Sequence, residues 1–129
     1  MKIIIENGGT KLDWGVLGEK NIHSVNSINL FHEESDISKK IKSIFPTNLI
    51  IKKNIEIDFY TAGLTHSTNL KIKKVLLNIF NMPTVNVFSD ILAASRALFN
   101  NDKGIVCIMG TGSNCAFFDG KKNHFNSIA

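Results

Sequence analysis

The chain has 129 residues, 43% of them hydrophobic, which is enough for one domain with a buried core. Its formal net charge is +4, but the lysines are scattered and there is 1 arginine, so we expect no nucleic-acid partner. The sequence shows no signal-peptide pattern and no apolar run near the roughly 20 residues that span a bilayer, which predicts a cytoplasmic protein without a membrane partner.

The first part of the chain predicts three strands and then a helix. The strands are expected at residues 2–6, 11–17 and 21–28. The first two pair naturally as a hairpin around the Asn-Gly-Gly segment. Residues 35–45 carry apolar side chains at helical spacing, with Ser35 or Asp36 as the candidate cap.

Strands and helices alternate over the rest of the chain. Strands are expected at 55–63, 84–90 and 104–110, and helices at 67–81 and 91–100. The helix at 67–81 has the clearest apolar stripe, with Pro83 just beyond its end. A final hairpin is expected to turn at Asp119-Gly120. The order βββαβαβ predicts an α/β fold with a mixed central sheet flanked by helices.

Two cysteines are too few for a disulfide framework. Cys107 and Cys115 also have a spacing that fits no common zinc signature. Both fall in apolar segments on either side of a glycine-rich stretch. We therefore expect two reduced, half-buried thiols.

A first candidate binding loop lies between the first two strands. Gly8 and Gly9 permit positive φ, so their N–H groups could point outward at an anion, and Thr10 adds a hydroxyl beside Lys11. Glu6, at the end of the strand, could hold a metal-bound water. The alternative is an ordinary Asn-Gly hairpin turn, one of the commonest turn signals.

A second glycine-rich loop interrupts the apolar run near the end of the chain. Gly110, Thr111, Gly112 and Ser113 are small residues between two apolar segments, with two hydroxyls among them. A plain glycine turn would explain the glycines alone. Together with the first loop, it suggests two hairpins that clamp a polyphosphate, although neither has the Gly-Lys-Ser/Thr sequence of a P-loop.

Two further candidates stand where strands end. Asp90 closes one predicted strand and opens the next helix, where it could cap the helix or act as a general base for a substrate hydroxyl. Gly63 ends another strand in a small-residue turn whose backbone could line a crevice, or which could simply connect a strand to a helix.

Four segments together carry a resemblance to a known family. They are IIIENGGTKLDWGVL, FYTAGL, VFSDILAASRALF and GIVCIMGTGSNCAFFDGKK. In this order they resemble the N-acetylglucosamine kinase and BadF/BadG-type ATPase family, related to sugar kinases and actin. The resemblance implies a ribonuclease-H-like fold, with ATP and Mg²⁺ as cofactors and a small sugar as substrate.

The same resemblance implies roles for individual residues. Thr10 and Thr111 would contact the ATP phosphates, together with the other residues of the two loops. Asp90 would activate the sugar hydroxyl, Asn29 and Gly63 would lie at the sugar, and Glu6 would hold Mg²⁺ through water. Glu6 stands where many members have aspartate, which moves the carboxylate by one methylene.

The resemblance also bears on domain organisation and on the reaction. Residues 1–103 would form the N-terminal ATPase domain, and residues 104–129 would form the first hairpin of a second domain. We therefore expect the N-terminal half of a kinase, which would be inactive alone. We also expect it to dimerise through exposed apolar surface. The expected reaction is phosphorylation of N-acetylglucosamine to its 6-phosphate. The alternative is a non-kinase ATPase that switches with nucleotide, like the activators of 2-hydroxyacyl-CoA dehydratases, which carry an iron–sulfur cluster on cysteines.

Overall fold

The computed structural model describes residues 1–109 and 113–125, which form two sheets and four helices. The elements are β1 (Lys2–Asn7), β2 (Lys11–Val16), β3 (Ile22–Asn26), α1 (Glu34–Ile44), α2 (Thr47–Ile50), β4 (Glu56–Thr61), α3 (His66–Ile79), β5 (Thr84–Ser89), α4 (Asp90–Phe99), β6 (Gly104–Met109), β7 (Ser113–Phe118) and β8 (Asn123–His124). None of the helices within these described ranges is long and apolar enough to cross a membrane.

The larger sheet has five strands in the order β3-β2-β1-β4-β5. β1, β2 and β3 pair antiparallel in sequence, whereas β4 and β5 join on the other side of β1 in parallel. Parallel neighbours need a crossover connection, and α3 supplies the one between β4 and β5. The mixed sheet predicted from the order of elements is confirmed.

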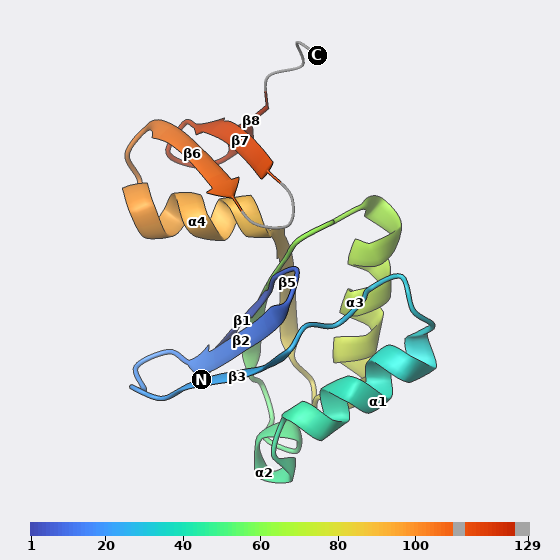
Figure 1. Ribbon diagram of the computed structural model, residues 1–129. Helices are drawn as coiled ribbons and strands as arrows, with labels where there is room; N and C mark the ends of the chain where they lie inside the picture. The colour runs from blue at the N-terminus through green and yellow to red at the C-terminus, as the bar shows by residue number, and fades with distance from the viewer. Residues whose placement is uncertain (110–112, 126–129) are drawn as a thin grey trace.

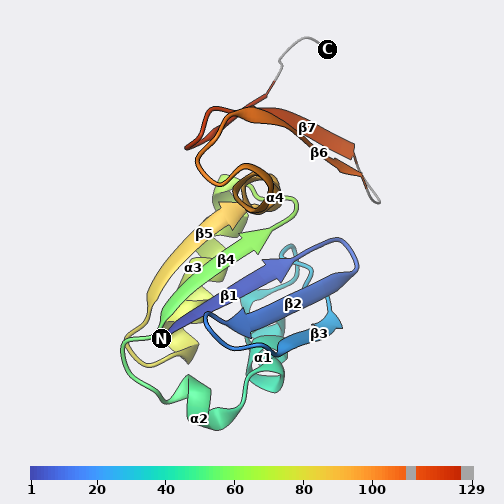
Figure 2. The same ribbon diagram turned by 90° about the vertical axis from the view of Figure 1, so that its left-hand side faces the viewer.

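Helices α1 and α3 lie side by side on one face of this sheet (Figures 1 and 2). Alternate residues of β1, such as Ile3 and Ile5, point into that layer and are almost completely buried. Ile72 and Leu76 of α3 meet them from the helix side. The apolar stripe predicted for this helix is therefore the side that packs.

Helix α4 connects the two sheets. It contacts the ends of β1, β4 and β5 on one side and the three-stranded sheet β6-β7-β8 on the other, as Figure 2 shows end-on. Ile91 of α4 forms a small second apolar cluster with Val106 and Ala116. The apolar residues of α4 thus pack with the hairpin, while the division at residues 103/104 stays a prediction.

Several element boundaries differ from the sequence prediction. Helix α1 starts after Glu33, so Ser35 and Asp36 lie inside the helix and do not cap it. Helix α3 starts one residue earlier than predicted, because Thr65 and Thr68 form a capping box before it. The short helix α2 was not predicted, since 4 residues show no periodicity, whereas β8 is the returning strand of the hairpin predicted at Asp119-Gly120.

Candidate functional site

Three parallel strands end together at one edge of the larger sheet. Asn7, Thr61 and Ser89 are paired across β1, β4 and β5, and each is the last residue of its strand. The segments that follow therefore start side by side, and they contain the predicted loop at 8–11, Gly63 and Asp90. Crevices at the carboxyl ends of parallel strands are the usual binding places in α/β sheets.

The turn between β1 and β2 is partly closed on itself. The Gly8 N–H donates to the Lys11 carbonyl oxygen over 2.9 Å, and neither Gly8 nor Gly9 has a positive φ. The prediction of two outward glycine N–H groups was wrong for Gly8, because the hairpin itself uses that donor. Thr10 and Lys11 are exposed, so the hydroxyl and the ammonium are what this turn presents to solvent.

Asn7 holds this edge together and was missed by the sequence reasoning. Its side-chain amide is buried and donates to the Ile28 carbonyl oxygen over 2.9 Å and to the Thr61 hydroxyl over 3.2 Å. Its Oδ1 accepts from the Ile28 N–H over 2.9 Å. A polar residue that ends an apolar strand just before Gly-Gly is the signal that could have revealed it.

The segment that carries Asn29 is fastened at this same edge. Ser27 donates its N–H to the Thr10 carbonyl oxygen, and the Lys71 ammonium reaches the Leu30 carbonyl oxygen over 3.0 Å. Asn29 itself is exposed, and its Oδ1 accepts from the Phe31 N–H over 2.9 Å. The structure thus brings Asn29 to the predicted crevice edge, where its amide oxygen stabilises a local turn.

Asp90 is the first residue of α4, and Ser89 occupies the cap position. The prediction that Asp90 caps the helix is therefore corrected by one residue. Partial burial raises the pKa of the Asp90 carboxyl, while the N–H groups of Ile91 and of Asp90 itself pull the pKa down. The net shift of the Asp90 pKa is upward.

Glu6 shares its side of the sheet with a second carboxylate. Asp13 stands directly opposite Glu6 on β2, and the Ser24 hydroxyl donates to its Oδ1. Burial raises the pKa of Glu6, and the charges of Asp13 and Asp90 raise it further. Asp13 was missed, although pairing residues outward from the turn at 8–11 places it opposite Glu6.

Gly63 lies two residues beyond the end of β4, with φ +64. A Cβ added there would meet no atom within 4 Å, so the backbone faces open space. Its positive φ explains the glycine without any ligand. The role of Gly63 at a sugar stays a prediction.

The second predicted loop falls largely outside the described residues. Gly110, Thr111 and Gly112 are not part of the described ranges, and Ser113 is described only as the first backbone position of β7. Met109 and Ser113 are paired, so the hairpin predicted around this loop is present. The contacts predicted for the loop stay predictions.

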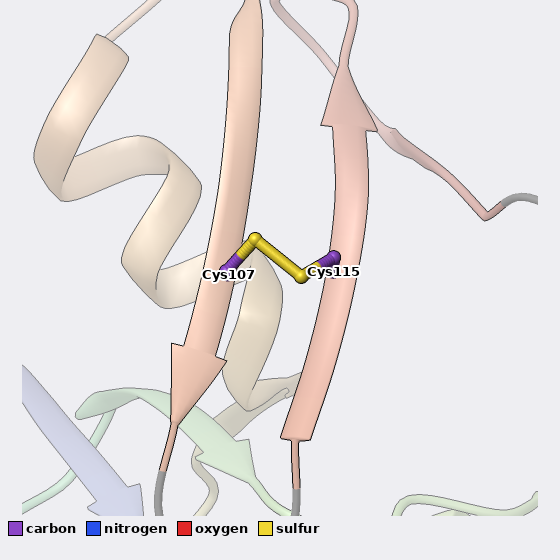
Figure 3. The surroundings of a disulfide bond; sticks show 2 residues. All are labelled: Cys107 and Cys115. Carbon is purple, nitrogen blue, oxygen red and sulfur yellow. A yellow bond between two sulfur atoms is a disulfide. The ribbon is translucent and has the colours of Figure 1, made fainter.

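The expectation of reduced, half-buried thiols was wrong. Cys107 and Cys115 form a disulfide between β6 and β7, and both are exposed (Figure 3). The reason is register, because the two cysteines are directly opposite on neighbouring antiparallel strands. Both side chains point away from α4, whereas Val106 and Ala116 point toward it.

The described residues offer carboxylates rather than a preformed metal cage. Within residues 1–109 and 113–125, no group of three or more His, Cys, Asp or Glu side chains is placed to hold a metal ion. The charges of Asp13 and Asp90 nevertheless raise the pKa of Glu6 at the strand ends. This edge combines a hydroxyl, a lysine ammonium and carboxylates, a set suited to phosphate groups and proton transfer.

Comparisons with known proteins are informative at the level of structure. Neither a protein-family model nor a curated protein matches the sequence. The fold is similar to the crystal structure of the putative N-acetylglucosamine kinase from Porphyromonas gingivalis, with a TM-score of 0.84 and 28% sequence identity. The match covers 99% of this chain and 48% of that chain, so this chain spans about half the length of its neighbour.

The mixed sheet and the extent of this match agree with the fold class suggested by the sequence motifs. The agreement reaches from β1 to the hairpin of β6 and β7. The chain is therefore similar in fold to about half of a putative N-acetylglucosamine kinase, which supports the resemblance seen in the sequence motifs.

Proposed function

We propose that this chain is the nucleotide- and sugar-binding N-terminal half of an ATP-dependent kinase that converts N-acetylglucosamine to its 6-phosphate. The observation that carries the proposal is the match to a putative N-acetylglucosamine kinase over 99% of the chain. The gathering of Thr10, Lys11 and Asp90 at one sheet edge supports it independently. We also propose that the fold is ribonuclease-H-like.

The turn at 8–11 would contact ATP phosphates through side chains. The Thr10 hydroxyl can donate to a phosphate oxygen, and the Lys11 ammonium can neutralise its charge. Asn7, which directly precedes the turn, fixes its position through hydrogen bonds to Ile28 and Thr61. Gly110, Thr111, Gly112 and Ser113 would approach the phosphates from the second hairpin.

The carboxylates would have two separate roles, in binding Mg²⁺ and in accepting a proton. Glu6 and Asp13 face each other in a crowded negative environment that a hydrated Mg²⁺ would relieve, with Glu6 holding the ion through water. Asp90, whose pKa is raised by burial, would accept the proton of the sugar hydroxyl as that oxygen attacks the terminal phosphate. Asn29 and Gly63 would line the sugar side of the crevice.

The proposal includes small-molecule substrates, a cytoplasmic setting and a homodimer. The competing function is a nucleotide switch without sugar phosphorylation. Its iron–sulfur cluster would be held by cysteines, whereas Cys107 and Cys115 both lie within the paired strands β6 and β7. Transfer of phosphate to N-acetylglucosamine distinguishes the two, because a switch releases ADP regardless of the sugar.

The experiment measures binding of Mg²⁺-tripolyphosphate and Mg²⁺-ATP to the 129-residue chain by calorimetry. Loss of a hydrogen bond to a charged oxygen in Thr10→Val should weaken both by roughly tenfold or more, since such bonds contribute about 1.5–3 kcal/mol. Thr84→Val is the matched control, because Thr84 is an exposed threonine at the opposite end of β5. Equal affinities for wild type and Thr10→Val would remove this turn from the phosphate site.

The role of Asp90 is tested in a kinase-active protein that contains this chain. Asp90→Asn should abolish phosphate transfer to N-acetylglucosamine and leave the affinity for Mg²⁺-ATP nearly unchanged, because the amide cannot accept the proton. Near-normal kcat in the asparagine variant would show that Asp90 is not the general base and is only the first residue of α4.

A further inference from the structure

The Cys107–Cys115 disulfide has a place in the fold that the proposed function does not use. The two residues are directly opposite in the antiparallel pairing of β6 and β7, with their Cα atoms 4.1 Å apart. Facing positions of this kind bring side chains close, since non-hydrogen-bonded pairs in antiparallel sheets have Cα atoms about 4.5 Å apart. The pairing of the strands therefore presents the two sulfur atoms to each other.

The surroundings of the disulfide are open to solvent. Its neighbours on the same face are Ile105, which is 74% exposed, and Phe117, which is 44% exposed. The opposite face of the hairpin carries Val106 and Ala116, which are buried in a cluster with Ile91 of α4. The hairpin is thus attached to the molecule by its other face, and a small thiol can reach the sulfur atoms without unfolding the core.

We propose that Cys107 and Cys115 form a reversible thiol–disulfide exchange site for small monothiols of the glutathione class. The thiolate of the first monothiol attacks one sulfur atom, forms a mixed disulfide and releases the other cysteine as a thiolate, which takes up a proton. A second monothiol then attacks the sulfur of the small molecule and releases the second cysteine. Two protein thiols and one small disulfide result, and two electrons have passed from the monothiols to the protein.

The redox state of the pair changes the rigidity of the β6–β7 hairpin. The bond joins residues 8 positions apart, so it restricts the open states of one short hairpin and has little effect on the larger sheet. Exposed disulfides are the ones that small thiols reduce most readily, because attack needs access to the sulfur. This inference concerns the hairpin alone and does not depend on the proposed kinase function.

The experiment equilibrates the purified full chain with mixtures of reduced and oxidised glutathione at neutral pH. Free thiols are then blocked with N-ethylmaleimide, and the products are resolved by intact mass. We expect a reversible change from the unlabelled to the doubly labelled chain, with millimolar reduced glutathione sufficient for reduction. Two results would overturn the proposal. One is a chain that is still labelled by N-ethylmaleimide after excess oxidised glutathione, and the other is a chain that is still unlabelled after millimolar reduced glutathione.

Hydrogen exchange measured by mass spectrometry tests the structural consequence. Peptides from β6 and β7 should exchange roughly tenfold faster in the reduced chain, whereas peptides from β1 and β4 should not change. The double variant Cys107→Ser, Cys115→Ser is the matched control and should exchange like the reduced wild type under both conditions. Equal exchange of the hairpin in oxidised and reduced wild type would contradict the inference.

Discussion

At the scale of single residues, the polar groups at the strand ends form two sets with different tasks. Asn7 is buried and satisfied by three hydrogen bonds, so it maintains the shape of the edge. Glu6 and Asp90 are accessible, and the pKa of each is raised. Groups that lose solvation without gaining a neutralising partner are typical of functional sites, and their cost appears in the stability of the fold.

Replacement of Asn7 tests its structural task. Asn7→Ala leaves the Ile28 N–H and carbonyl oxygen and the Thr61 hydroxyl without this partner, so we expect a loss of about 3 kcal/mol in the free energy of unfolding. Urea denaturation followed by circular dichroism measures it. The control is Asn26→Ala, because Asn26 is exposed on the edge strand β3. Similar losses in both variants would show that the burial of Asn7 contributes nothing.

Glu6 predicts a pH dependence of stability. Its pKa is raised above the ordinary glutamate value of 4.5, so the folded chain keeps the proton to a higher pH than the unfolded chain does. Stability attributable to this group is therefore full at low pH and falls as the pH rises from 4.5 through the raised value. Glu6→Gln should therefore become more stable than wild type as the pH rises above 4.5.

The matched control for Glu6 is Glu19→Gln, since Glu19 is exposed in the turn after β2. Both variants remove one negative charge from a chain of net charge +4, so general charge effects cancel in the comparison. Denaturation curves at several pH values provide the measurement. If Glu6→Gln and Glu19→Gln follow the same pH profile, the crowding of Glu6 by Asp13 and Asp90 has no energetic effect.

At the scale of elements, local sequence decides where helices and turns begin, and neighbouring elements decide which side chains fit at those positions. Thr65 and Thr68 satisfy the first N–H groups of α3 reciprocally. The β7–β8 turn is held by Asp119, whose carboxylate accepts from the N–H groups of Lys121 and Lys122. The bond to His124 and these N–H groups keep the pKa of Asp119 well below its usual range.

The β7–β8 turn needs glycine for two separate reasons. Gly120 has φ +100, and a Cβ there would stand 2.5 Å from the Asn101 carbonyl oxygen. Gly18, in the turn after β2, provides a comparison, because it has φ +91 but a Cβ there would meet no atom within 4 Å. We expect Gly18→Ala to cost about 1 kcal/mol from backbone strain alone, and Gly120→Ala about 3 kcal/mol, since the backbone must also shift. Thermal unfolding of the two variants compares them, and equal losses would mean that the contact with Asn101 relaxes freely.

At the scale of the whole molecule, apolar surface is distributed unevenly. The outward face of the three-stranded sheet exposes Ile105, Phe117 and Met109, the last of these by 86%. β6 is also the outer strand of that sheet. Exposed apolar side chains beside an outer strand are the usual starting point of association between protein chains.

We therefore expect the chain to associate with itself in solution, in keeping with the proposed homodimer. Light scattering as a function of concentration measures the apparent mass. Ile105→Lys should lower it toward that of a single chain, because a charged group then stands in the middle of the face. Leu70→Lys, at an exposed leucine of α3, is the control and should have no effect. A monomer at all concentrations in wild type would contradict the expectation.

The sequence by itself determined the elements and their order, because helical and strand periodicities are local properties of short segments. The stripe of α3, the hairpin of β1 and β2 and the turn at Asp119-Gly120 were all recognisable in this way. It also marked Glu6, Thr10 and Asp90 as candidates, since each stands where an apolar strand stops. Small elements such as α2 carried too few residues for a pattern.

Tertiary structure alone decided which of these residues meet. Asn7 and Thr61 are separated by 54 positions and become neighbours only because β4 pairs in parallel with β1. The pKa of Glu6 responds to Asp90 for the same reason, since Glu6 is near the end of β1, Asp90 follows β5, and both strands end at one edge. Cys107 and Cys115 were expected as reduced thiols, but strand register and the face covered by α4 decided that they bond and stay exposed. Contacts between distant segments depend on packing, which no local pattern contains.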